Sequence, residues 1–199
     1  MTRINTRKYK VIPFNKLGRL FHTFGASIYP QAVRQTLCDF LQTLDTQASI
    51  IDIGSGTGML CDFGHACRDD LLYHAVDPAE GMMKYAKPYI VTHKATAESL
   101  PFEDNYFDLA MMGESLHHFK DAYKALDECT RVLKKGGKLF IYDFDISTFK
   151  GKFIRKSEMF LGEPGFFFSP NDLAQKLEAL GFKVDVETYN WRYVIKATL

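Results

Sequence analysis

The chain has 199 residues, of which 46% are hydrophobic and 25% are charged, and its formal net charge is +1. This composition is typical of one globular domain with a substantial core, and the small net charge gives no overall field that would favour nucleic acids or membranes. No apolar run reaches the roughly 18 residues of a transmembrane helix, and none follows the basic N-terminus as in a secretory signal. We therefore expect a cytoplasmic protein without a membrane span.

Basic residues are concentrated at the N-terminus. Those that precede the first acid, Asp39, are Arg3, Arg7, Lys8, Lys10, Lys16, Arg19 and Arg34. We interpret them as a solvated basic surface. Attraction of an anionic substrate, RNA or lipid headgroups is the alternative that the sequence leaves open.

The four cysteines give no sign of a metal site. They are Cys38, Cys61, Cys67 and Cys129, and they show neither a C-x-x-C pair nor a spacing typical of metal ligands. We therefore expect small buried thiols in a reducing compartment and no bound metal.

The first part of the chain is predicted to be helical. Between Pro13 and Pro30, hydrophobic residues recur at the spacing of a short amphipathic helix, namely Phe14, Leu17, Leu20, Phe21 and Phe24. A second helix is predicted over 31–44, and its apolar face consists of Val33, Leu37, Phe40, Leu41 and Leu44.

The stretch S-I-I-D-I-G-S-G-T-G-M-L at 49–60 predicts a buried strand at 49–53, a sharp turn and a helix at 58–67. The turn contains Gly54, Gly56 and Gly58. Glycine permits positive φ and lets the main chain approach a ligand, and the helix N-terminus offers free N–H groups. The dinucleotide fingerprint would need glycine at Met59, and a P-loop would need a lysine after the glycines. A glycine turn without a ligand is the alternative.

A second predicted strand, after the glycine turn, also ends near an aspartate. The strand predicted at 71–76 ends at Asp77, which lies 25 residues beyond Asp52 at the end of the first strand. A carboxylate in this place can accept both hydroxyls of a ribose, as in other nucleotide-binding folds. The alternative is a helix N-cap, because Pro78 is suited to open a helix that 81–87 would continue.

The remaining elements alternate between strands and helices until the last two strands. Strands are predicted at 90–95, 107–112, 138–144, 182–188 and 192–198, and helices at 121–134, closed by Gly136-Gly137, and at 170–180, capped by Ser169. Residues 146–168 are predicted to be irregular. The alternation predicts an α/β fold with a mostly parallel sheet, and the short link at 189–191 predicts that the last two strands are antiparallel.

The fourth strand ends in M-G-E-S-L-H-H-F at 112–119, and the carboxyl end of a central strand faces the ligand crevice in such folds. Glu114, His117 and His118 are therefore candidate acid–base groups, since histidine suits proton removal near neutral pH. The alternative is that these residues only shape the loop.

Three segments together resemble one enzyme family. D-x-G-x-G-x-G at 52–58, A-T-A-E-S-L-P-F-E-D-N-Y-F-D at 95–108 and R-V-L-K-K-G-G at 131–137 are similar to motifs of the class I S-adenosylmethionine (SAM)-dependent methyltransferases. The second segment closely resembles type 11, which includes the ubiquinone and menaquinone C-methyltransferases. The resemblance covers roughly 45–145. It implies a Rossmann-like, seven-stranded sheet of order 3-2-1-4-5-7-6, with SAM as cofactor and S-adenosylhomocysteine as product.

The resemblance also assigns site residues. The glycines would line the methionine end of SAM, Asp77 the ribose and the turn at 96–98 the adenine, with backbone at 112–113 beside the sulfonium. The family usually has aspartate at Thr96, so we expect weaker SAM binding or a larger part for the backbone there. The complete expected cofactor set is Tyr29, Asp52, Gly54, Ser55, Gly56, Gly58, Asp77, Pro78, Met82, Thr96, Ala97, Glu98, Met112, Gly113, Glu114 and His117.

Catalysis needs little from side chains, because the methyl of SAM is already activated and positioning supplies most of the acceleration. His117, Glu114 and Tyr29 are weak catalytic candidates, and Tyr29 resembles a lid tyrosine of the family. We expect one domain, divided into an N-terminal helical lid at 1–45, a SAM-binding core at 46–145, an aromatic and basic acceptor-site insertion at 146–168, and a C-terminal helix and hairpin at 169–199.

The expected function is methyl transfer to a small-molecule acceptor, aromatic or quinone-like, by a monomer or homodimer. Two alternatives remain open. One is an RNA methyltransferase that uses the basic N-terminus and the insertion, for which binding would depend strongly on salt. The other is a regulatory module that holds SAM without turnover.

Overall fold

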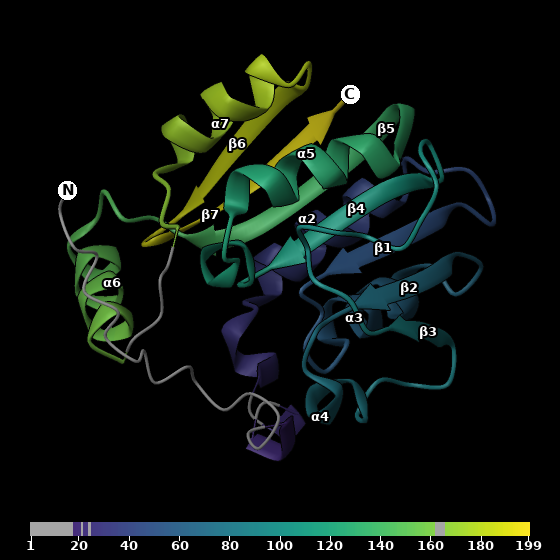
Figure 1. Ribbon diagram of the computed structural model, residues 1–199, viewed down its shortest axis with the longest axis horizontal. Coiled ribbons are helices and arrows are strands. Elements are labelled where there is room, and N and C mark those ends of the chain that lie inside the picture. The colour runs from purple at the N-terminus through teal and green to yellow at the C-terminus, as the bar shows by residue number, and fades with distance from the viewer. Residues whose placement is uncertain (1–17, 21, 24, 162–165) are drawn as a thin grey trace, which may run out of the picture.

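The structure is a computed structural model that describes residues 18–20, 22–23, 25–161 and 166–199. Its centre is a seven-stranded sheet of order β3-β2-β1-β4-β5-β7-β6, which confirms the predicted order. Figure 1 shows the strands side by side, with helices in front of and behind them. The strands are β1 (Ser49–Ile53), β2 (Leu72–Val76), β3 (Ile90–His93), β4 (Phe107–Gly113), β5 (Leu133–Phe144), β6 (Lys183–Tyr189) and β7 (Arg192–Thr198).

Strand direction follows from the connections. β1, β2, β3, β4 and β5 run parallel to one another, since helices or long segments link them, whereas β7 pairs with β5 in the antiparallel direction. β6 and β7 are joined by a tight turn at Asn190, whose φ is +57°, and they are antiparallel as predicted. The parallel strands therefore end at the same edge of the sheet, which is where ligands bind in such folds.

Two hydrophobic layers sandwich the sheet. One lies under α5 (Ala122–Val132) and α7 (Pro170–Ala179), and the other lies under α2 (Gln31–Leu41) and α3 (Met59–Cys67). Alternate residues of β1 enter opposite layers, so Ile51 packs toward α5 and Ile50 toward α3. The other helices are η1 (Gly25–Ile28), α4 (Glu80–Met83), η2 (Leu116–His118) and α6 (Phe149–Leu161).

Helix starts follow the capping signals in the sequence. Asp121 caps α5 by accepting from Lys124 N at 3.1 Å, and Ser169 caps α7 by accepting from Asp172 N at 3.2 Å. Pro170 occupies the first position of α7, where its missing N–H costs no hydrogen bond. These helices were predicted at nearly the observed bounds.

Two predicted boundaries are wrong. Pro78 does not open a helix, because the turn after β2 is closed by the carboxylate of Asp77 and α4 begins only at Glu80. Gly136-Gly137 does not close α5. The backbone is already extended at Leu133, and both glycines lie in an irregular part of β5, where Gly136 N donates to Leu199 O.

Residues 146–168 are not irregular throughout, since α6 occupies 149–161. The hydroxyl of Thr148 accepts from Gly151 N at 3.0 Å, and Thr148 O accepts from Lys152 N at 3.0 Å. Thr148 thus supplies the N-cap of a helix whose interior lacks the strong apolar periodicity that predicts one.

The prediction of four free thiols is also wrong. Cys38 of α2 and Cys67 of α3 form a disulfide, with their Cα atoms 5.6 Å apart, whereas Cys61 and Cys129 are free and buried. The pairing joins two helices that pack on each other, which cysteine spacing alone does not reveal. The predicted reducing compartment therefore has no support from cysteine chemistry.

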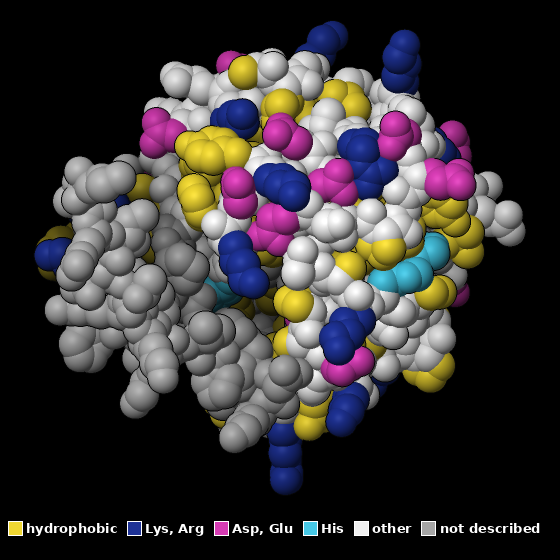
Figure 2. Space-filling model, viewed as in Figure 1, with side chains coloured by type: hydrophobic (Ala, Val, Ile, Leu, Met, Phe, Trp, Pro, Cys, Tyr) yellow, Lys and Arg dark blue, Asp and Glu magenta, His cyan; other side chains and the backbone are white. Residues whose placement is uncertain are grey.

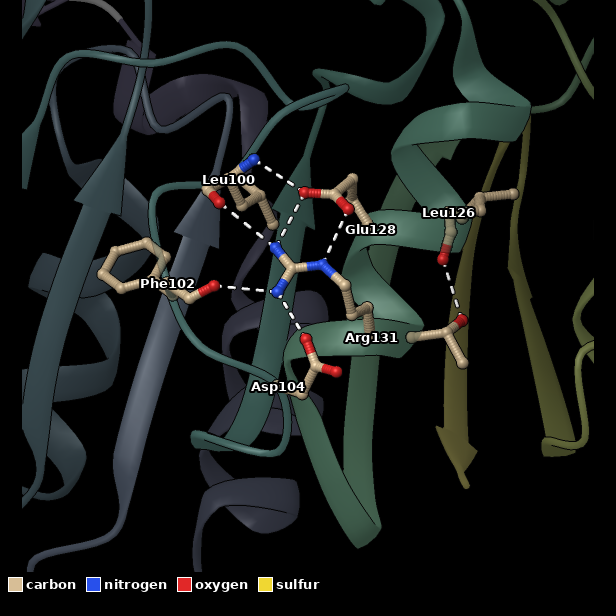
Figure 3. A network of polar contacts seen from close by, with 7 residues as sticks. Leu100, Phe102, Asp104, Leu126, Glu128 and Arg131 are labelled. Carbon is tan, nitrogen blue, oxygen red and sulfur yellow. Dashed lines mark hydrogen bonds and ion pairs between the residues drawn. The ribbon is translucent and has the colours of Figure 1, made fainter.

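Arg131 joins two of the segments that carry the family resemblance (Figure 3). Its guanidinium donates to the carbonyls of Leu100 and Phe102 at 3.1 and 2.8 Å and pairs with Asp104 at 2.8 Å. Glu128 pairs with Arg131 at 2.7 Å and accepts from Leu100 N at 2.8 Å. The loop after β3 is therefore fixed to α5.

Most of the helix predicted near 14–24 lies outside the described residues, of which 18–20 and 22–23 are helical. Within the part of the chain that the structure describes, no helix is long and apolar enough to cross a membrane.

Candidate active site

The glycine turn after β1 is bound to the end of β2. Gly54, Gly56 and Gly58 all have positive φ, at +73°, +54° and +79°. The amides of Gly54 and Ser55 both donate to Val76 O, at 2.8 and 3.1 Å. The turn needs glycines for its backbone conformation, as predicted, and its shape is fixed before any ligand arrives.

Two of these glycines face different surroundings. A Cβ on Gly54 would lie 2.6 Å from Ser115 Cβ, so this glycine is required by packing against the loop after β4. A Cβ on Gly56 would meet only the flexible Cε of Met82, at 3.3 Å. Gly56 therefore leaves space beside the turn that the described protein atoms do not fill.

Asp77 connects the turn to the end of β2. Its Oδ2 accepts from Gly56 N at 2.8 Å and its Oδ1 accepts from Ala79 N at 2.7 Å. Partial burial raises the pKa of this carboxyl, and the two backbone N–H groups oppose that rise. Because a carboxylate has about four acceptor positions, both oxygens can still accept from a ligand. Asp77 shapes the turn, and its role toward a ribose stays a prediction.

Asp52 lies beneath the turn, on the face of the sheet that α3 covers. It is 1% exposed, and the thiol of Cys61 donates to its Oδ2 at 3.6 Å. Burial raises the pKa of Asp52 to about 7. Any effect of this carboxyl on a ligand is therefore electrostatic and works through the turn above it.

The segment predicted to meet adenine forms a compact turn. Ser99 N donates to Thr96 O at 3.1 Å, and Ala97 is buried in the core. Glu98 Oε1 accepts from Asp121 N at 3.1 Å, which fixes the turn to the start of α5. No side chain of this turn projects a carboxylate without a protein partner, so Thr96 and the backbone remain the groups proposed for a ligand.

Tyr29 is brought to the end of β4, from 84 positions earlier in the chain. Its hydroxyl donates to Gly113 O at 3.1 Å, and its ring packs near Tyr142 and Phe63, with centroids 5.3 and 5.5 Å away. A Cβ on Gly113 would lie 2.5 Å from this hydroxyl, so glycine is required there. Tyr29 therefore lies against the backbone of Gly113, which the resemblance assigns to the sulfonium, whereas the buried Met112 packs in the layer on the opposite face of the sheet.

A buried histidine–aspartate pair lies across the ends of β4 and β5. His117 Nδ1 is 2.7 Å from Asp143 Oδ1, and both side chains are about 5% exposed or less. The same oxygen accepts from Phe144 N at 2.8 Å. Burial raises the pKa of Asp143 to about 7. The ring of Phe167 stacks over His117 with centroids 5.7 Å apart, which keeps the pair dry.

A second acid–base pair lies beside the first. Glu114, whose φ is +53°, binds the guanidinium of Arg192 at 2.5 Å. Burial and the nearby Asp143 raise the pKa of Glu114, and Arg192 opposes that rise. The guanidinium also stacks on Trp191, 3.8 Å from the ring. Figure 2 shows a hollow near the centre of this view, with histidine and hydrophobic side chains at its floor.

Sequence reasoning missed Asp143, Arg192 and Trp191. The acids in D-F-D at 143–145 end the fifth strand, so the strand-end rule that found Asp77 could have found Asp143. Arg192 begins an antiparallel strand, and only the pairing of β7 with β5 brings it to the site.

One feature of the turn suits a ligand that supplies hydrogen bonds. Among the described residues, the buried Ser55 Oγ has no hydrogen-bond partner. Buried hydroxyls are normally satisfied, so a partner from outside the protein is expected here. Together with the space beside Gly56, this fits an amino-acid or nucleoside group that lies along the turn. Met82 lies at the margin of that space, and the expected cofactor contact of Pro78 stays a prediction.

Comparisons with known proteins identify relatives. A model of the family described as "Methyltransferase domain" (type 11) matches residues 51–141. The ubiquinone/menaquinone biosynthesis C-methyltransferase UbiE of Campylobacter jejuni is 30% identical over 141 residues, which cover 66% of this chain and 58% of UbiE. The 2-phytyl-1,4-naphtoquinone methyltransferase of Nostoc punctiforme is 46% identical over 61 residues, or 31% of this chain and 26% of the relative.

A solved structure covers more of the chain. A SAM-dependent methyltransferase of Thermotoga maritima is 25% identical, with a TM-score of 0.72 over 94% of this chain and 97% of that one. By contrast, the chain spans less than two thirds of the length of the curated relatives it matches.

Proposed function

This chain belongs to the type 11 class I SAM-dependent methyltransferases, and from that premise we propose that it transfers a methyl group from SAM to a small-molecule acceptor that is aromatic or quinone-like. The family and the fold imply SAM as the cofactor. The observation that carries the proposal is the placement of two unlike groups along one sheet edge. A preformed glycine turn with Asp77 lies on one side, and the buried His117–Asp143 pair and the half-buried Glu114–Arg192 ion pair lie on the other.

The residues proposed to hold SAM are those of the glycine turn and its neighbours. The turn and Ser55 would contact the methionine end, Asp77 the ribose, and the turn at 96–98 the adenine. Tyr29 and the backbone of Gly113 would lie near the sulfonium. SAM, when bound, supplies an activated methyl group. The chain's own task is then to hold the acceptor atom in line with that methyl, which contributes up to about 7–11 kcal/mol.

The His117–Asp143 pair is proposed to handle the acceptor's proton. A carboxylate on Nδ1 fixes the imidazole tautomer and its orientation and stabilises the protonated ring. Such a pair suits an acceptor that loses a proton on methylation, such as a phenol, an enol carbon or an amine. Glu114 and Arg192 would orient the acceptor beside it. UbiE and the naphtoquinone methyltransferase favour a quinone-like acceptor.

The test is calorimetry with SAM and S-adenosylhomocysteine, followed by methyl transfer from labelled SAM to a panel of phenols, hydroquinones and amines. We expect binding of both ligands and label transfer to one acceptor class. Failure of both ligands to bind would overturn the cofactor assignment. SAM binding with transfer to RNA alone would replace the acceptor class, and SAM binding without transfer to any acceptor would favour a regulatory module.

The predicted division into lid, core, insertion and C-terminal unit is retained as part of the proposal. The described residues of the lid are 18–20, 22–23 and 25–45. Among them, Tyr29 and α2 pack directly on the sheet, and their role as a lid stays a proposal.

A further inference from the structure

Helix α6 projects beyond the carboxyl edge of the sheet, in the direction in which β4 points (Figure 1). Phe149 and Phe153, one helical turn apart, are 87% and 68% exposed. These are the two largest exposures among the large hydrophobic residues of the described chain. A face of this kind needs a partner, because exposed phenyl rings gain about 1.5–3 kcal/mol each on full burial.

The attachment of α6 shows which face is outward. Gly151 is buried, and a Cβ on it would collide with the carbonyl oxygen of Asp145. Gly151 lies two residues from each phenylalanine, and two residues correspond to about 200° around a helix, so the rings point away from the attached side. The exposure of the rings therefore follows from how the helix is anchored.

The charges around these rings have one sign. Between Asp145 and Glu158 the chain contains no acid, and its basic residues there are Lys150, Lys152, Arg155 and Lys156. All four are exposed, and Lys150, Lys152 and Lys156 flank the two rings, whereas Arg155 lies one turn from Gly151 on the attached side. Two apolar rings flanked by cations match the acyl boundary and the anionic headgroups of a bilayer.

A hollow of about 360 Å³ adjoins the helix. Thr148, Phe149 and Lys150 line one side, and Asn190 and Trp191 of the turn before β7 line the other. Trp191 O accepts from Asp145 N at 2.8 Å, which holds the turn against the start of α6. Tryptophan beside lysine is typical of residues that settle at a membrane interface.

We propose that α6 is a docking surface for an anionic lipid bilayer, from which the enzyme takes an amphiphilic acceptor. Docking of α6 on the bilayer is argued from exposure and charge alone, whereas uptake of an amphiphilic acceptor rests on the proposed function. A contact chain supports this uptake, because the guanidinium of Arg155 lies 6.0 Å from the ring of Phe167, and that ring stacks on His117. The docking helix and the proton-handling pair thus share Phe167 as a neighbour.

The test is co-sedimentation of the full chain with two kinds of vesicle, pure phosphatidylcholine and phosphatidylcholine mixed with phosphatidylglycerol. We expect binding to the mixed vesicles only, weakened by salt. The double variant Lys152→Glu/Lys156→Glu should weaken binding at least about 25-fold, since each basic residue near an anionic surface contributes about fivefold. Phe149→Ser/Phe153→Ser should weaken it about 10–100-fold.

Matched variants far from α6 serve as controls. Leu72→Ser/Val91→Ser removes two side chains that are each 52% exposed, and Lys120→Glu/Lys135→Glu reverses two exposed charges. Both controls should bind mixed vesicles within about twofold of the wild type. SAM calorimetry on every variant verifies the fold independently of membranes.

Three results would overturn the docking surface. They are no wild-type binding to mixed vesicles, equal binding by the α6 variants, and binding of homopolymeric RNA through the same residues without vesicle binding. If vesicles bind but SAM does not, docking stands and the proposed function fails. If SAM binds but vesicles do not, the docking surface fails and the proposed function stands.

Discussion

On the β1–β2 side of the site, backbone groups hold the glycine turn in place, whereas on the β4–β5–β7 side the fixed groups are paired side chains. Gly56 N and Ala79 N both donate to Asp77, which follows β2 directly. By contrast, Glu114 and Arg192 are 78 residues apart in the sequence, and His117 and Asp143 are 26 apart. The first side is built from two short segments, and the second from three distant strands.

The difference matches what each side must do. A cofactor shared by many enzymes is met by a backbone shape that a short motif encodes. An acceptor that differs between enzymes is met by side chains, which can change without altering the sheet. If this division is right, variants on the β1–β2 side should change SAM binding, and variants on the β4–β5–β7 side should change methyl transfer.

The largest expected effect is on transfer. His117→Asn should lower the transfer rate by about 10²–10⁴-fold, because a positioned proton acceptor contributes that much. SAM affinity should stay within about twofold of the wild type, as measured by calorimetry. His65→Asn, which alters a histidine of α3 stacked on Tyr89, is the control and should retain both. A loss of SAM binding by His117→Asn would contradict the division of the site into a cofactor side and an acceptor side.

The next effect is on binding. Gly56→Val should reduce SAM affinity by more than about 100-fold. The new side chain would fill the space beside the turn, and valine would have to adopt the φ of +54° that it disfavours. Gly136→Val is a matched control, because Gly136 has φ of +74° and open space around it, far from the turn. Both variants should lose about 1–2 kcal/mol of stability from the left-handed backbone. Equal SAM affinity for both variants would show that the glycine turn does not bind the methionine end of SAM.

A smaller effect is expected for Asp77→Asn. The amide can still accept from Ala79 N, but the two ribose hydroxyls lose a charged acceptor, so SAM binding should weaken by about 1–3 kcal/mol. Asp108→Asn tests a half-buried aspartate that also accepts from a backbone amide, Ser49 N at 2.8 Å, at the opposite edge of the sheet. Calorimetry should show no change for this control, and unchanged affinity for Asp77→Asn would sink the ribose assignment.

The smallest effect concerns stability and pH. Asp52 ionises at about 7 in the folded chain against an ordinary value of 3.8, so between these values the folded state binds a proton that the unfolded state has lost. This carboxyl therefore lowers stability by about 1.4 kcal/mol per pH unit as pH rises from about 4 to 7, with no further loss above. Asp52→Asn should make that slope shallower in urea unfolding and leave the part due to Asp143, whose pKa burial also raises to about 7, and the exposed Asp45→Asn should leave the slope unchanged. A slope unchanged by Asp52→Asn would place the titration elsewhere.

Local patterns in the sequence predicted most element bounds and the shape of the glycine turn, whereas the family resemblance implied the sheet order that the structure confirms. The isoleucines of β1, the glycine turn and Asp77 lie within a few residues of the structures they form, so spacing and backbone preference are enough. The family resemblance extended this to the loop at 95–108, which Arg131 fixes to α5.

Tertiary structure alone decided the acceptor side. Arg192 reaches Glu114 only because β7 enters the sheet antiparallel to β5, and Tyr29 reaches Gly113 only because α2 packs on the rear face. The Cys38–Cys67 disulfide likewise depends on how α2 and α3 pack. Contacts between distant segments depend on how whole layers pack, and no local spacing in the sequence records that packing.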